Sequence, residues 1–211
     1  MPIPEDPFMN RLPLQPVVLS GQIVRLEPLR LEHIQPLAAV GLHPELWRWT
    51  TTRAQTVDDI RTYVETALSW QREETALPFV TVAQSSGEVI GSTRFANIDH
   101  ANRRAEIGWT WVTPAWQRTG ANVEAKYLML QHAFETLGCI RVEFKTDALN
   151  EKSRTALRGI GAIEEGILRS HMIVWDGRLR DSVYYSVLPS EWPDVKRRLE
   201  EKLSVAAGRS T

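Results

Sequence analysis

Hydrophobic and polar residues alternate over several short stretches of this chain, and such alternation predicts β-strands. In residues 17–29, for example, Val24 and Leu26 alternate with Ile23, Arg25 and Glu27. Further strands are predicted at Leu77–Ala83, Val89–Ala96, Ala105–Val112 and Ile140–Thr146, then at Ile167–Trp175 and Arg178–Leu188. The last two flank Asp176-Gly177, a dipeptide typical of two-residue hairpin turns.

Other stretches place apolar residues three or four positions apart, which is the spacing of an amphipathic helix. The clearest case is 56–73, where Thr56 and Asp59 form a capping-box pattern ahead of the apolar residues. A long helix is predicted between Gly120 and Gly138, with the apolar stripe Val123, Tyr127, Leu130, Phe134 and Leu137. Shorter helices are predicted at Leu31–Val40 and 151–159, and a last one after Ser190 with Trp192, Val195, Leu199 and Leu203 facing inward.

The predicted order is a strand, two helices, three strands, a long helix, a strand, a helix, a hairpin and a final helix. This order predicts a mixed α/β fold with helices on both faces of one sheet. Prolines at 2, 4, 7, 13 and 16 predict a flexible arm over residues 1–16. The domain itself is predicted at 17–204, followed by a disordered tail at 205–211.

Composition narrows the functional classes. The 25 basic and 26 acidic residues give a net charge of −1, so no basic excess suggests a nucleic-acid partner. The apolar runs are too short to predict a membrane span, and the amino terminus lacks the pattern of a signal peptide. The single cysteine, Cys139, excludes an internal disulfide and indicates the reducing cytoplasm. The five histidines lack metal-ligand spacing, so no metal site is predicted.

The candidate chemistry begins in the turn between the strand Ala105–Val112 and the long helix. The first N–H groups of a helix lack partners inside the helix, and the helix dipole adds positive charge there. Gly120 lets the backbone approach a ligand closely. Such a turn can hold a pyrophosphate. An ordinary strand-to-helix connection that contains a glycine explains the turn equally well when it is taken alone.

The wider context resembles the GNAT superfamily of N-acetyltransferases. In that family the turn after the fourth strand reads Gln/Arg-x-x-Gly-x-Gly/Ala, and here it reads Gln117-Arg118-Thr119-Gly120-Ala121-Asn122, with asparagine in the last place. Asn150 matches the asparagine that opens the helix after the fifth strand. Three segments resemble the Rim-type protein-alanine N-acetyltransferase branch, namely Trp116–Tyr127, Arg141–Arg154 and Gly161–Gly166. The resemblance extends over residues 18–190.

The resemblance implies a fold, a cofactor and a reaction. The fold is a single domain whose mixed, mostly antiparallel sheet splays between its fourth and fifth strands and admits acetyl-CoA. The reaction moves an acetyl group to a primary amine by direct attack in a ternary complex. The cofactor-binding residues it implies are Trp109, Trp111, Val112, Gln117, Arg118, Thr119, Gly120, Ala121, Asn122, Asn150 and Ser153.

Amide formation needs a group that removes a proton from the amine and one that protonates the leaving thiolate. Glu106 is the candidate base, directly or through a water, because it lies early on the strand that would flank the thioester; a solvent-facing edge carboxylate is the alternative. The tyrosine that many family members use as the acid is replaced by Leu157. The resemblance therefore implies Ser153 as the acid, with an ordinary first-turn serine as the alternative, and Tyr184 and Tyr185 in reserve.

The acceptor is the least determined part. The resemblance favours the N-terminal amine of a protein; an amino acid, polyamine or antibiotic, or a non-catalytic acyl-CoA sensor, are the alternatives. Trp47 and Trp49 are expected either to form an acceptor wall or to pack in the core. A wide groove between this region and the hairpin would favour a peptide. Lys126 and Lys145 are expected to be solvated, and the aromatic content is compatible with a homodimer.

Overall fold

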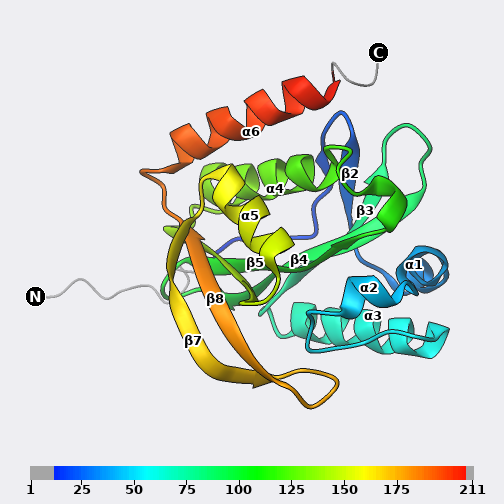
Figure 1. The fold of residues 1–211 in the computed structure, drawn as a ribbon. Coiled ribbons are helices and arrows are strands. Elements are labelled where there is room, and N and C mark those ends of the chain that lie inside the picture. The colour runs from blue at the N-terminus through cyan, green and yellow to red at the C-terminus, as the bar shows by residue number, and fades with distance from the viewer. Residues whose placement is uncertain (1–11, 208–211) are drawn as a thin grey trace, which may run out of the picture.

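The computed structural model describes residues 12–207, which form one eight-stranded sheet between two groups of helices (Figure 1). The strands are β1 (Leu19–Ser20), β2 (Val24–Pro28), β3 (Leu77–Ala83), β4 (Val89–Asp99), β5 (Arg104–Val112), β6 (Arg141–Asp147), β7 (Ile163–Ile173) and β8 (Leu179–Val187). Their spatial order is β1-β2-β3-β4-β5-β6-β8-β7. Every neighbouring pair is antiparallel except β5 and β6, which are parallel.

The helices divide between the two faces of the sheet (Figure 1). One face carries α1 (Ile34–Gly41), α2 (Pro44–Trp47) and α3 (Val57–Arg72), and the other carries α4 (Ala121–Gln131), α5 (Glu151–Ile160) and α6 (Trp192–Ala207). Short helical segments are η1 (Leu31–His33), η2 (Pro114–Trp116) and the π-helical η3 (His132–Thr136). Helix α6 lies over α4, so this side of the molecule is three layers deep.

Each face has its own core. The larger core joins the sheet to α4, α5 and α6 through residues such as Phe79, Phe95 and Met129. The second core lies under α1–α3 and is built around the rings of Trp47 and Trp111. Because successive strand residues face opposite sides, β5 contributes to both cores. The predicted mixed α/β fold with helices on both faces is therefore confirmed.

The predicted splay lies between β5 and β6. The two strands pair in parallel only at Arg104↔Arg141, Ala105↔Val142 and Glu106↔Glu143. Beyond Glu106, β5 runs on to Val112 and β6 to Asp147 without pairing to each other. The β6-facing edge of the second half of β5 is therefore open to a ligand.

Several element boundaries differ from the prediction. The predicted strand at 17–29 is split into β1 and β2 by a bend at Gln22-Ile23. Strand β7 begins at Ile163, four residues earlier than predicted, because its first part is an exposed sheet edge where polar residues are tolerated. The four-residue helix α2 was not predicted, since it is too short to show a helical repeat.

The predicted long helix ends near Gly138 as expected, and Leu130 and Leu137 of its predicted apolar stripe are buried in the larger core. Val123, Tyr127 and Phe134 are only partly buried and pack toward α6, where Tyr127 and Phe134 meet the ring of Trp192. The fully buried positions of α4 are Ala121, Glu124, Ala125, Lys126, Leu128, Met129 and Leu130. Because α4 is covered by the sheet on one side and by α6 on the other, a single apolar stripe does not describe it.

The two ends of the domain differ slightly from the predicted limits. Residues 1–11 of the predicted arm lie outside the described residues; within 12–16, Leu12 is buried in the larger core and its N–H bonds to Nδ1 of His100 at 3.2 Å. Helix α6 continues past the predicted limit of 204 to Ala207, while 208–211 lie outside the described residues. No helix within 12–207 has the length and apolar character needed to cross a bilayer.

Candidate active site

The turn Gln117–Asn122 joins η2 to α4 and has an unusual backbone. Arg118 and Gly120 both have positive φ angles, 67° and 92°, and Gly120 is the residue just before α4. A Cβ atom at Gly120 would lie 2.9 Å from Cδ1 of Ile23 and 3.1 Å from Cβ of Ala206, so a side chain would be both strained and crowded. Glycine is therefore required here by the backbone and by its neighbours.

Several N–H groups of this turn have no protein acceptor. Within the described part of the chain, none is present for the N–H groups of Arg118, Gly120 and Asn122. The Thr119 hydroxyl donates to the carbonyl of Trp116 at 2.8 Å, and the side-chain amide of Gln117 donates to the carbonyl of Val112 at 3.1 Å. These side-chain bonds fix the turn and leave its backbone N–H groups unpaired. Unpaired N–H groups in such a turn fit a diphosphate.

Glu124 anchors this end of α4. Its carboxylate is buried and accepts hydrogen bonds from the N–H groups of Gln22, Ile23 and Val24 at 2.9, 2.7 and 2.7 Å. These bonds fix the bend between β1 and β2 against the first turn of α4. The turn before α4 is therefore supported by a segment about 100 residues away in sequence.

The start of α5 places three further predicted residues. Asn150 is the N-cap of α5, and its Oδ1 accepts from the N–H of Ser153 at 3.1 Å. Ser153 lies one turn into the helix and is partly exposed. Leu157, at the position of the missing tyrosine, is buried in the larger core. Lys152 contacts Oε1 of Gln117, so the first turn of α5 touches the turn before α4.

The open half of β5 contains a β-bulge. The pairing of β4 with β5 shifts between Ser92 and Arg94, and Trp109 takes a positive φ of 49°. The Trp109 ring packs edge-on against Trp70 at 5.2 Å. The Trp111 ring is buried in the second core, so its side chain packs rather than facing a ligand. Val112 is also buried. In this strand the backbone edge is the part open to a ligand.

Glu106 lies at the apex of the splay, at the last paired position of β5. It is only 3% exposed, which excludes the alternative of a solvent-facing edge carboxylate. Its Oε2 accepts from Nδ2 of Asn97 at 2.8 Å and lies 3.3 Å from Nζ of Lys145. The carboxylate is therefore held in one orientation beside the opening.

Both lysines that were expected to be solvated are buried or nearly so. The Lys145 side chain is 12% exposed and pairs with Glu106, while its Nζ lies 5.7 Å from the centre of the Tyr184 ring. Lys126 is 8% exposed, and burial lowers its pKa to about 7. That expectation was wrong because Lys126 faces the sheet and Lys145 lies beside Glu106 of the neighbouring strand, and neither contact is visible in the local sequence.

The acceptor side is formed by the helices α1–α3 and the β7–β8 hairpin. Trp47 is buried, with its ring 5.7 Å from that of Trp111, so it belongs to the core. The hairpin is tied to this region because Nε1 of Trp175 donates to the carbonyl of Trp47 at 3.0 Å. Trp49 remains partly exposed and is flanked by Arg48 and Arg178. This hydrogen bond thus connects the tip of the β7–β8 hairpin to α2.

Further charged groups lie at the ends of β6 and β8. Asp147 has a fully buried carboxylate, which pairs with Arg178 at 2.5 Å. Arg180 donates to the carbonyl of Trp49 at 3.4 Å, and burial lowers its pKa. His171 contacts the Ser182 hydroxyl at 3.0 Å, and burial lowers its pKa as well. These residues are separated widely in sequence, and no local motif marks them.

Cys139 is buried, and burial raises the pKa of its thiol to about 11. It is therefore a core residue and unsuited to act as a nucleophile at neutral pH, as its sequence context predicted.

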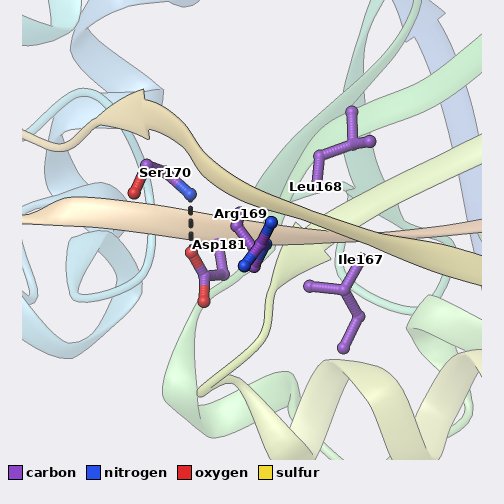
Figure 2. Close-up of a pocket in the computed structure, with 5 residues that line it drawn as sticks. All are labelled: Ile167, Leu168, Arg169, Ser170 and Asp181. Atoms are coloured by element: carbon purple, nitrogen blue, oxygen red, sulfur yellow. Dashed lines mark hydrogen bonds between the residues drawn. The ribbon is translucent and has the colours of Figure 1, made fainter.

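A separate hollow of about 710 Å³ lies at the outer edge of the sheet, lined by Ile167, Leu168, Arg169, Ser170 and Asp181 (Figure 2). Figure 2 shows the N–H of Ser170 bonded to the Asp181 carboxylate, at 2.7 Å. Strand β7 bulges between Leu168 and Met172, and this irregularity shapes the hollow. None of its residues belongs to the splay or to the turn before α4.

A mixed sheet that opens between two parallel strands, next to a turn with unpaired amides, defines the N-acyltransferase class. The family described as Acetyltransferase (GNAT) domain matches residues 24–163. The chain therefore belongs to the GNAT acetyltransferase family, whose acyl donor is acetyl-CoA. The turn amides and the open edge of β5 are the groups that would hold this donor.

Three similar proteins illustrate the relationship. "Putative ribosomal N-acetyltransferase YdaF" of Bacillus subtilis is 32% identical over 81% of this chain and 92% of its own. A GCN5-related N-acetyltransferase structure from Brucella melitensis is 32% identical, with a TM-score of 0.83, and covers 91% of this chain and 87% of its own. Mycobacterium smegmatis RimJ, solved in complex with CoA-disulfide, is 28% identical with a TM-score of 0.74, covering 91% and 92%. These similarities support the Rim-type branch.

Proposed function

We propose that this enzyme acetylates the N-terminal amine of a protein or peptide. The observation that carries this choice is the charge of the acceptor side. Four arginines gather there: Arg48 and Arg178 beside Trp49, Arg53 over Trp175 at 4.3 Å, and Arg180 at the Trp49 carbonyl. A polyamine would bring several positive charges against these arginines, whereas a peptide amino terminus brings one. The name of the similar YdaF protein, a putative ribosomal N-acetyltransferase, favours a protein acceptor.

In this proposal the acceptor ammonium approaches Glu106 from the side of the β7–β8 hairpin. Lys145 and Tyr184 lie on that face of the sheet, and β6 pairs Lys145 opposite Tyr184. Glu106 accepts the proton that the ammonium must lose, directly or through a water. Ser153, in the first turn of α5, is the candidate donor on the other side.

The hydrogen bond from Trp175 to Trp47 limits how a peptide can lie. Because this bond bridges the hairpin tip, a long peptide cannot pass beneath the tip while the bond is intact. We expect only the first few residues of an acceptor peptide to enter, with the rest leaving the site. This geometry also admits a free amino acid, which is the second candidate acceptor.

An acceptor panel tests the proposal. Purified protein is incubated with acetyl-CoA and one of three amines: a short peptide with a free amino terminus, the same peptide with a blocked terminus and an internal lysine, or spermidine. Thiol release and mass spectrometry report the product. We expect acetylation of the free-terminus peptide alone. Faster reaction with spermidine would overturn the acceptor assignment, and CoA binding without thiol release for any amine would favour a non-catalytic sensor.

Two further expectations belong to this proposal. Acetyl-CoA and nascent or ribosomal amino termini meet in the cytoplasm, which agrees with the single buried cysteine. A homodimer remains an expectation, and sedimentation of the purified protein would test it.

A further inference from the structure

The family resemblance described above assigns no role to Lys126. It lies on the sheet-facing side of α4, the helix that follows the anion-binding turn. Its Nζ donates to the Thr110 hydroxyl at 2.9 Å and lies 5.6 Å from the centre of the Phe144 ring. Thr110 is on β5 and Phe144 on β6, and both lie past the last paired position of those strands. The ammonium therefore lies between the unpaired halves of β5 and β6, on the face of the sheet that α4 covers.

The surroundings of this ammonium are mostly uncharged. Within residues 12–207 this ammonium takes part in no ion pair. The charged group that acts on its pKa is Glu106 on β5. Thr110 is in turn 2.7 Å from the Thr93 hydroxyl, which contacts the Met129 sulfur. Burying an ammonium with one neutral partner is unfavourable, so its retention at this place needs a compensating role.

Burial lowers the pKa of Lys126 to about 7, while the charge of Glu106 opposes that shift. An ammonium with such a pKa donates its proton near neutral pH far more readily than a serine hydroxyl does. The two ionisable groups also lie on opposite faces of the sheet, since Glu106 pairs with Lys145 on the acceptor side and Lys126 rises from the α4 side. Acid and base are thus separated by the opening between them.

We propose that Lys126 protonates the sulfur of CoA when the acyl group leaves, the task that the family resemblance implies for Ser153. This inference rests on the acetyl-transfer activity described above. As the new C–N bond forms and the C–S bond breaks, the sulfur keeps the bonding electron pair and takes a proton from the ammonium. Lys126 becomes a neutral amine. The acceptor ammonium loses two protons in all: one passes through Glu106 to water before the attack, and the second goes to Glu106 as the C–N bond forms. Exchange with water then restores both groups.

The first test measures binding chemistry rather than turnover. The pKa of the thiol of enzyme-bound CoA is obtained from its thiolate absorbance across a pH series. The guanidinium of Lys126→Arg stays charged while the thiol titrates and favours the thiolate, whereas the wild-type amine is already neutral there. We therefore expect the thiol pKa to be about one unit lower in Lys126→Arg than in Lys126→Met. Lys202→Met, which changes an exposed lysine on α6, is the matched control and should match the wild type.

The second test measures turnover. We expect Lys126→Met to lower kcat about 100-fold with little change in KM for acetyl-CoA, and Ser153→Ala to lower it much less. Because Lys126 acts as an acid, the wild-type kcat should fall as pH rises through its pKa. Lys126→Arg keeps a charge that does not titrate in this range, so it should retain part of kcat and lose that decline.

Thr110→Val gives an independent variant, since it keeps the ammonium and removes the hydroxyl that positions it; kcat should fall by a smaller factor than in Lys126→Met. Equal thiol pKa values in Lys126→Arg and Lys126→Met would overturn the assignment while leaving the acetyltransferase activity intact. Failure of the wild type to bind CoA at all would instead contradict the donor site itself. Circular dichroism confirms that each variant is folded.

Discussion

The two halves of this active site are built differently. The donor half is contiguous: the turn Gln117–Asn122 and the start of α4 supply backbone amides from neighbouring residues. The acceptor half brings together α2, the end of β6 and the β7–β8 hairpin, and contacts such as Trp175 to Trp47 join residues 128 positions apart. In the proposed site, backbone groups would bind the donor and side chains would select the acceptor. We therefore expect donor binding to depend on conformation and acceptor choice to depend on residue identity.

Glu106→Gln should have the largest effect, because it removes the base between the two halves while keeping the shape of the side chain. We expect kcat to fall about 100-fold or more, with donor affinity unchanged. The control is Glu143→Gln, which removes the charge at the paired position of β6, where Glu143 bonds Arg104 and Arg141. Steady-state kinetics of both variants measure the difference; an equal loss in both would contradict a role for Glu106 in proton transfer.

Gly120→Ala should weaken donor binding about tenfold or more, measured by calorimetry with CoA. The alanine is strained by about 1–2 kcal/mol in the left-handed region and crowds Ile23. Gly87→Ala carries the same type of strain, since Gly87 has a φ of 72°, but it has open space around it and lies in the β3–β4 turn. Equal CoA affinity in the two variants would show that the turn before α4 is not the donor site.

Glu124→Gln should destabilise the fold by about 1–3 kcal/mol, because an amide cannot accept from all three N–H groups that the carboxylate holds. Urea unfolding measures the loss. Glu200→Gln alters an α6 carboxylate that accepts from the Tyr127 hydroxyl at a more exposed position, and it should cost less. If both variants are equally stable, the support of α4 by the β1–β2 bend is unimportant.

Trp175→Phe should have the smallest effect. It removes the hydrogen bond to the Trp47 carbonyl but leaves an aromatic ring for Arg53. We expect about a fivefold change in KM for the acceptor peptide and none for acetyl-CoA, since one neutral hydrogen bond contributes about 1 kcal/mol. Trp192→Phe, in the α4–α6 layer, should leave both KM values unchanged. A change in donor KM for Trp175→Phe would mean that the two halves are not independent.

The same contrast explains what the sequence could predict. The order of strands and helices, and the position of the turn before α4, follow from local patterns, because periodicity and a glycine at a helix start act over a few residues. The partners of Glu106 do not, since Asn97 and Lys145 reach it only through strand pairing. Lys126 was misjudged for a related reason: its burial depends on Thr110 of β5 and Phe144 of β6, which reach it only through the packing of α4 on the sheet.

The Trp47 alternatives illustrate a second limit. Its sequence position permits either a substrate wall or a core residue, and only the packing of its ring against Tyr63 and Trp111 decides for the core. Trp49, two residues later, is partly exposed and can still contact an acceptor. Side chains that choose substrates are therefore harder to predict than the backbone that binds the donor.

The crowding around Gly120 has a practical consequence for handling this protein. Ile23, near the beginning of the fold, and Ala206, in the last turn of α6, pack against the turn from two directions and support it. A shortened protein that ends at residue 203 would retain every residue that touches substrate in the proposals above. It would nevertheless lose the packing of Ala206 against Gly120. Trimming or tagging the carboxyl end should therefore lower the affinity for CoA even when the enzyme folds normally.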